Sequence, residues 1–266
     1  MSVNEGARKH RPQQVHVDSL NNPADSRYYS GPSQGHNLFI QDFSKHLMPN
    51  NPKPNKYSIR EELAHGISHA IGAGLAIIGL VILLITATQY GDVRHVFSAA
   101  IYGSSLILLY LASTLYHLFA SPRVKRFFQK LDHTMIYILI AGTYTPLTLV
   151  TLRGAWGWTL FGLVWAMALC GLVLELIVKK RIQWLSLTLY LGMGWLLLVA
   201  LKPLMGALAT GGFVLLLTGG LLYTFGVIFY VWKNLSYHHA IWHLFVMAGS
   251  MVHFFAILFY VMPAAA

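Results

Sequence analysis

Two histidines one helical turn apart, His239 and His243, stand at the start of the last long apolar segment of the chain. Residues spaced i, i+4 lie on one face of a helix, about 6 Å apart along its axis, so two imidazoles can reach one ion. Matching polar residues occur in two other segments. Ser113 and His117 lie at the end of one, and Asp132 lies at the start of the next. Three imidazoles and a carboxylate predict a bound metal.

The chemistry of such a set is that of a catalytic zinc site. A zinc ion held by three neutral imidazoles keeps its fourth position open for water and lowers the pKa of that water to about 7. Asp132 would hold or deprotonate that water, and Ser113 could donate a hydrogen bond to a substrate carbonyl or its oxyanion. Alternatively, these residues are hydrated at the membrane interface and only bridge helices. Spacing and depth leave both interpretations open.

Other histidines compete for the same role. His65 and His69 form a second i, i+4 pair at the start of the first apolar segment. Their acidic neighbours fall in the first helical turn, where we expect solvation, so hydrogen bonding between helices is favoured. His253 lies about 15 Å beyond His243 along the helix, too far to share an ion, and is expected to be a hydrogen-bonded core residue.

The composition is that of a membrane protein. Of the 266 residues, 56% are hydrophobic and 11% charged, whereas soluble domains average about 45–50% and about 25%. The apolar residues gather in runs that can cross a bilayer, which takes about 20 helical residues. We therefore predict an all-α membrane protein, a bundle of seven transmembrane helices over residues 67–89, 96–119, 131–152, 156–178, 184–204, 211–232 and 240–262.

Lys and Arg predict the orientation of the bundle. Sixteen of them precede the first segment or lie in alternate loops, and three lie in the other connections. By the positive-inside rule the N-terminus is cytoplasmic and the C-terminus outside. The candidate zinc site then lies near the cytoplasmic face of the membrane. The net charge of +10 indicates this topology and contact with anionic membrane lipids, and does not favour a nucleic-acid partner.

Two parts of the chain are distinguished by composition. Residues 1–57 are polar and proline-rich and are expected to be a disordered cytoplasmic tail, in which four histidines are too scattered for a metal site; residues 58–266 form the transmembrane domain. Ser58, followed by Glu61 and Glu62, has the form of a helix N-cap.

Four residues within the segments carry local predictions. Pro146 predicts a kink and Pro203 a helix boundary. Glu175 is expected to pair with the basic cluster of residues 179–181, and the single cysteine, Cys170, is expected to be a buried apolar residue.

Five motifs together resemble one family. They are Glu61-Glu62-Leu-Ala-His65-Gly-Ile-Ser-His69, Ser113-Thr-Leu-Tyr-His117, Leu131-Asp132-His133, Gly142-Thr-Tyr-Thr-Pro146 and His239-Ala-Ile-Trp-His243. The set is similar to the bacterial hemolysin III proteins, which are grouped with the progestin and adipoQ receptors and the alkaline ceramidases in a superfamily of proposed membrane hydrolases. The resemblance covers residues 61–262, and His65 stands where the family motif leads us to expect Asn.

The resemblance implies zinc bound by His117, His239 and His243, with Asp132 and Ser113 beside the metal or its water. It implies structural or outer roles for the His65–His69 pair. The leading hypothesis is a zinc-containing, seven-helix protein of a bacterial inner membrane that can hydrolyse a lipid amide or ester bond and serves membrane homeostasis. The alternatives are a non-enzymatic receptor or sensor with structural zinc and, less favoured, a haemolytic cytolysin, for which no amphipathic insertion segment is visible.

Overall fold

The computed structural model describes residues 57–178 and 181–263 of the chain, so the predictions for the tail, with His10, His16, His36 and His46, lie outside the described residues. Within those ranges the structure is all-helical, and seven helices are long and apolar enough to cross a membrane. The predicted fold class is thereby confirmed, whereas the orientation of the termini stays a prediction. The helices are α2 (Ile59–Tyr90), α3 (Val93–Leu118), α4 (Pro122–Pro146) continued by the π-helix η1 (Leu147–Leu152), α5 (Gly154–Ile177), α6 (Gln183–Gly194) continued by the 3₁₀ turn η2 (Leu196–Ala200) and α7 (Leu201–Ala207), α8 (Thr210–Val231) and α9 (His238–Tyr260).

The start of α2 is set by the predicted cap. The Glu61 N–H donates to Ser58 Oγ at 3.3 Å, and the Ser58 N–H donates to Glu61 Oε2 at 2.9 Å. This capping box satisfies two backbone donors that a helix start otherwise leaves unpaired. It holds the first turn of α2, which carries Glu62 and precedes His65, in one position.

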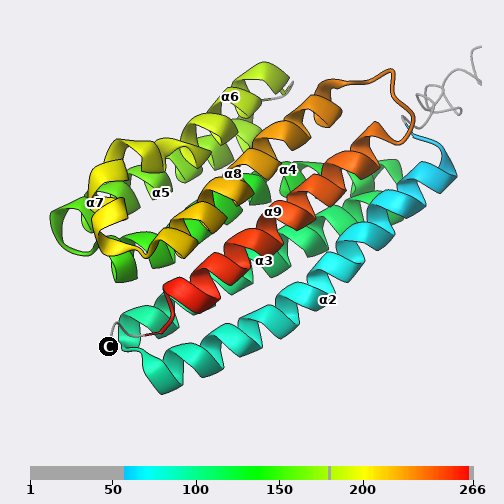
Figure 1. The fold of residues 1–266 in the computed structure, drawn as a ribbon. Coiled ribbons are helices and arrows are strands. Elements are labelled where there is room, and N and C mark those ends of the chain that lie inside the picture. Colours follow the sequence, from blue (N-terminus) through cyan, green and yellow to red (C-terminus); the bar gives the residue numbers. More distant parts are fainter. Residues whose placement is uncertain (1–56, 179–180, 264–266) are drawn as a thin grey trace, which may run out of the picture. The chain divides into compact units, whose positions relative to one another are not determined.

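The order of packing brings distant parts of the chain together. α2 packs against α3, α3 against α4, and α4 against α5, while α9 lies against both α8 and α2. As Figure 1 shows, the start of α9 thus lies beside the start of α2. Gly66 permits the approach of α2 to the end of α3, because a Cβ atom there would lie 2.9 Å from Leu118 Cδ2.

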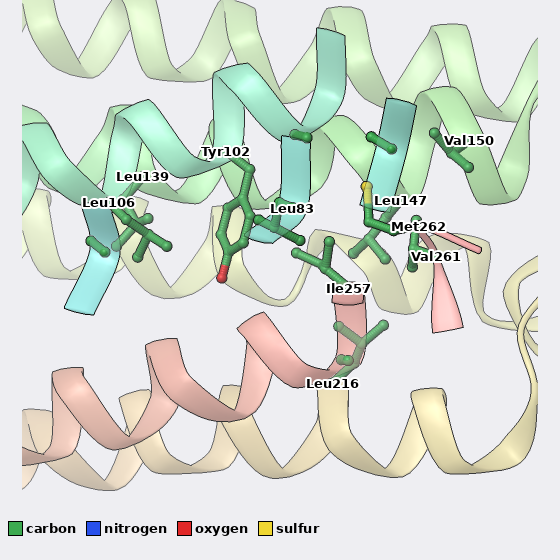
Figure 2. Packing of buried hydrophobic residues seen from close by; sticks show 14 of the residues in the cluster. Leu83, Tyr102, Leu106, Leu139, Leu147, Val150, Leu216, Ile257, Val261 and Met262 are labelled. Atoms are coloured by element: carbon green, nitrogen blue, oxygen red, sulfur yellow. The ribbon is translucent and has the colours of Figure 1, made fainter. Parts of the chain in front are cut away.

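An apolar core joins these helices along much of their length. Figure 2 shows side chains from several helices meeting there, among them Leu83, Tyr102, Leu147 and Ile257. Leu83 and Ile257 are completely buried. Ile257 lies eighteen residues beyond His239, which is about 27 Å of helix, so this core extends from the histidines to the opposite end of the bundle.

The outer surface is apolar, as lipid contact requires. On α2, Ile71, Ile78 and Ile85 recur every seven residues and are each at least half exposed. Cys170 is also exposed, on α5, so its predicted burial is wrong. In lipid an apolar side chain gains little by turning inward, because the acyl chains outside are equally apolar.

The two prolines behave differently. At Pro146 the helix changes from α to π, the irregularity that the sequence predicted there. Pro203 does not end its helix, because α7 continues to Ala207. The predicted helix boundary lies just before it, because η2 ends at Ala200 and α7 begins at Leu201. Pro203 thus falls in the first turn of α7, where a missing N–H removes no helical hydrogen bond.

Candidate metal centre

The three predicted ligands meet at one end of the bundle. His117 lies in the last turn of α3, and His239 and His243 lie in the first two turns of α9. All three are buried. One ligand atom from each lies within 4.8 Å of the others. The folding of the chain therefore gathers the three imidazoles that the motifs indicated.

Two of these rings are held from outside by groups on α2. The His117 Nδ1–H donates to Glu62 Oε2 at 2.8 Å, and Lys125 Nζ donates to the other oxygen of that carboxylate at 2.8 Å. The His243 Nδ1–H donates to the carbonyl oxygen of His65 at 3.3 Å. Such outer bonds fix the ring and its tautomer, which leaves Nε2 of each histidine as the nitrogen available to an ion.

The expectation of a solvated Glu62 is wrong. Its side chain is only 12% exposed and reaches across to α3. Helical spacing correctly put Glu62 in the first turn of α2, but only the packing of α2 on α3 turns that part of the helix towards His117.

The donor set fits zinc. Zinc takes imidazole nitrogen at about 2.0–2.1 Å, usually with four ligands in tetrahedral order. Here three buried imidazoles come within reach of one point, and a carboxylate and a carbonyl hold the outer nitrogens of two of them. Histidines bound to zinc commonly have outer partners of these two kinds.

Asp132 and Ser113 lie beside the histidines at a cavity. Both line it together with His239 and His243, and both are buried. The cavity has a volume of about 140 Å³, counted as the space open to the centres of water-sized molecules, and extends along α9 as far as His253. The His253 Nε2–H donates to the Leu216 carbonyl oxygen at 3.0 Å, because a carbonyl oxygen can only accept. His253 is therefore the hydrogen-bonded core residue that was expected.

The body of the cavity is apolar. Its wall comes from α3, α4, α6, α8 and α9 and is formed largely by aliphatic and aromatic side chains, among them Leu109, Ile136, Leu139, Leu191, Val227 and Val246. Asp132 and the ligand histidines lie at one end, whereas the polar side chains Thr143, Thr224 and His253 elsewhere in the wall are hydrogen-bonded to backbone carbonyl oxygens. A molecule with a long apolar part and one polar, reactive group would match this distribution.

Arg181 links several helices beside the polar end of the cavity. Its Nε donates to Glu175 Oε1 at 2.9 Å, which confirms the predicted pairing of Glu175 with the basic cluster. Its Nη1 donates to the Tyr230 hydroxyl at 2.8 Å and lies 3.3 Å from His133 Nε2. One guanidinium thus ties α4, α5 and α8 together. The other two cluster members, residues 179–180, lie outside the described residues.

His65 and His69 lie within the same group of rings. The centroid of His65 is 4.7 Å from that of His117, 4.9 Å from that of His239 and 5.4 Å from that of His243. His69 stacks on His243 with centroids 3.6 Å apart. The second histidine pair is therefore part of the cluster. Its spacing was visible in the sequence, but its direction depends on how α2 is turned in the bundle.

The fold and site define a multi-pass membrane protein with a buried histidine cluster at the polar end of an apolar cavity. A profile of the haemolysin III-related family matches residues 57–254, so the chain belongs to this family. It is 49% identical over 207 residues to Hemolysin-3 of Bacillus cereus, covering 78% of this chain and 94% of the relative.

Two other relatives extend the comparison. The Hemolysin-3 homolog of Bacillus subtilis (strain 168) is 48% identical over 204 residues, with 77% of this chain and 96% of the relative covered. The human Monocyte to macrophage differentiation factor is 30% identical over 226 residues, with 82% and 91% covered. The family match covers all seven long helices except the last turns of α9, and the resemblance seen in the motifs is confirmed.

Proposed function

We propose that His117, His239 and His243 hold one zinc ion and that the protein hydrolyses an amide or ester bond of a membrane lipid. The observation that carries this proposal is the junction of the histidine cluster with the cavity. The same wall that contains Asp132, Ser113 and two of the three ligands continues into apolar lining. The two parts of such a lipid, a polar carbonyl and an apolar chain, correspond to the two parts of the site.

The shape of the cavity selects among lipid substrates. Moving an acyl chain from the bilayer into an apolar protein cavity gains little free energy, because both surroundings are apolar. The shape of the wall therefore determines which chain fits, and its depth determines which bond reaches the polar end. By excluding bulk water, the wall also limits reaction to water held at the histidine cluster.

The chain's own residues supply proton transfer and orientation. Zinc, when bound, supplies a Lewis acid for the carbonyl oxygen and lowers the pKa of water at the site to about 7. The water oxygen forms the new C–O bond as the C–N or C–O bond of the substrate breaks. Asp132 accepts the proton that water loses and returns it to the leaving nitrogen or oxygen. The Ser113 hydroxyl donates a hydrogen bond to the carbonyl oxygen as negative charge develops there.

The first test is metal content. Purified full-length protein is expected to contain close to one zinc per chain, and the His239→Ala/His243→Ala variant none. Elemental analysis after exhaustive dialysis measures both. Wild-type protein that contains no metal would contradict the proposed zinc site.

The second test separates chemistry from metal binding. Asp132→Asn is expected to keep its zinc and to abolish lipid turnover, and Ser113→Ala to lower kcat by about 10²–10³-fold, the effect of removing one oxyanion donor. Lipidomes of cells that contain wild-type or Asp132→Asn protein would reveal the substrate as the lipid that accumulates in the variant. Equal lipidomes, with zinc present in both proteins, would argue against hydrolysis.

A receptor or sensor with structural zinc is the second candidate. It is favoured by the way the cluster ties α2, α3 and α9 together through Glu62, His65 and the ligands. In that case chelation of zinc lowers the melting temperature of the protein in detergent, and the wild type turns over no lipid. Turnover that depends on Asp132 would rule this candidate out as the complete function.

Cytolysis is the third candidate, and its support is the name of the Bacillus cereus relative, Hemolysin-3. A cytolysin added to dye-loaded liposomes should release the dye. Intact liposomes after addition of folded protein would exclude it.

A further inference from the structure

We propose that His65 is a fourth imidazole ligand of the same ion and occupies the position that a catalytic zinc site keeps open. This inference rests on the proposed zinc site, but not on lipid hydrolysis. It concerns a residue to which the motif resemblance gave only a structural or outer role. Its consequence is a metal centre that is closed at rest and opens when His65 leaves the ion.

The first support is the placement of the ring. The three proposed ligands have ring centroids 5.3 Å, 5.2 Å and 4.6 Å apart. His65 stands 4.7–5.4 Å from each of them, which is the same range. Four imidazoles arranged tetrahedrally around zinc, with nitrogens at about 2.0–2.1 Å, would have centroids roughly 5 Å apart. The His65 ring therefore lies where a fourth ligand would lie.

The second support is the state of its nitrogens. His65 is completely buried, and among the described residues neither of its ring nitrogens has a hydrogen-bond partner. Buried polar side-chain atoms are nearly always paired, so these two nitrogens require an explanation. A metal ion would satisfy one of them directly.

The third support is freedom to turn. Glu62 and the His65 carbonyl hold Nδ1 of His117 and His243. The His65 ring has no such restraint, so rotation about its Cβ–Cγ bond breaks no hydrogen bond to a described residue. One of its nitrogens already belongs to a second set of potential ligands with Glu62 and His117, all within 4.8 Å. A small rotation would redirect that ring from His117 towards the centre of the cluster.

The alternative is that His65 only packs. The Tyr57 ring lies edge-on to it at 4.8 Å, and the histidines surround its other sides. Packing alone would leave two buried nitrogens unsatisfied without benefit, whereas the Asn that we expected at this position could pair locally. The substitution His65→Asn therefore removes the proposed ligand while keeping a polar residue that the family motif accommodates.

A closed centre changes what the site does. Four protein ligands are the pattern of structural zinc sites, and three protein ligands with one open position are the pattern of catalytic sites. With His65 bound, a small anion cannot reach the metal. Release of His65 from the ion would expose the position next to Asp132 at which hydrolysis is proposed, so His65 would regulate access to it.

The test counts ligands on the metal in full-length protein in detergent. Zinc K-edge X-ray absorption should show four histidine nitrogens for the wild type and three with one oxygen for His65→Asn. His69→Asn is the matched control, because it makes the same change one turn further along α2 and should keep four. We also expect His65→Asn to bind zinc about 10–100-fold more weakly, at least the loss that follows removal of an outer partner.

An anion titration gives an independent readout. With cobalt(II) in place of zinc, azide should leave the visible spectrum of the wild type unchanged and shift that of His65→Asn. Zinc-bound wild type with three histidines, or with azide binding equal to that of the variant, would overturn the role of His65 and leave the proposed function intact. Metal-free wild type would overturn both. If His65→Asn fails to fold, the wild-type ligand count alone decides.

Discussion

The carboxylate of Glu62 offers a direct test of how this protein holds a metal. Glu62→Gln keeps the length of the side chain and a hydrogen-bond acceptor but removes the charge that receives the His117 Nδ1–H. The bond is short, 2.8 Å, and the Glu62 side chain is 12% exposed while that of His117 is fully buried. Charge-assisted bonds in such surroundings are roughly twice as strong as neutral ones, so His117 should lose both orientation and basicity.

The expected loss follows from comparable outer partners. Removing the partner of a metal-binding histidine lowers metal affinity by about 10–100-fold, which corresponds to about 1.4–2.7 kcal/mol. The same carboxylate also receives Lys125 Nζ at 2.8 Å. Lys125→Gln therefore serves as the matched control, because it removes the ion pair but keeps the bond to His117. An ion pair near the surface is worth about 0–1 kcal/mol, so the control should lose less than about fivefold.

The assay is competition for zinc between the purified protein and a chromophoric chelator. We expect Glu62→Gln to lose zinc at chelator concentrations at which wild type and Lys125→Gln retain it. Wild-type affinity in Glu62→Gln would refute the role of this carboxylate. An equal loss in both variants would show that local charge, and not the orientation of His117, sets the affinity.

Three further predictions concern the surrounding structure. Arg181→Met leaves the buried Glu175 carboxylate without its ion pair and should destabilise the protein by about 3–5 kcal/mol, and a double variant with Glu175→Gln should recover most of the melting temperature. Gly72→Ala should lower the melting temperature, because its Cβ would lie 2.9 Å from Cδ1 of the buried Tyr110 ring, whereas Gly74→Ala, with nothing within 4 Å, should be neutral or stabilising by up to about 1 kcal/mol. Hydrogen bonds from the His95 side chain and from backbone N–H groups lower the pKa of Asp92, in the α2–α3 loop, from 3.8 to about 2. A carboxyl whose pKa falls on folding stabilises the fold above its unfolded pKa, so this contribution to stability should disappear as the pH falls from about 4 to about 2. Acid titration of Asp92→Asn should lack this loss of stability.

Most of the fold could be predicted because membrane helices are encoded locally. Each predicted segment overlaps an observed helix, since a run of about 20 apolar residues has few other stable structures in a bilayer. The cap at Ser58 was equally local. Pro203 indicated the helix boundary beside it, but the 3₁₀ turn that ends there has no clear signal in a uniformly apolar stretch. Cys170 shows the same limit, since hydropathy does not tell which face of a lipid-bathed helix turns inward.

The sequence by itself indicated which residues could form a metal centre and predicted the depth at which they lie. His117, His239 and His243 were identified by spacing, by their place at the matching ends of segments and by the motifs that contain them. Those features repeat along single helices and need no knowledge of neighbours. The orientation of the termini stays a prediction of the same kind, drawn from the distribution of Lys and Arg.

Only the tertiary structure decided what surrounds that centre. The rotation of α2 against α3 and α9 makes Glu62 a partner of His117 and brings His65 among the ligand rings. Helical periodicity defines a face, but the direction of that face depends on side-chain packing between helices that are far apart in the chain. In an apolar bilayer, where hydrophobicity does not distinguish inside from outside, that direction emerges only when the helices are assembled.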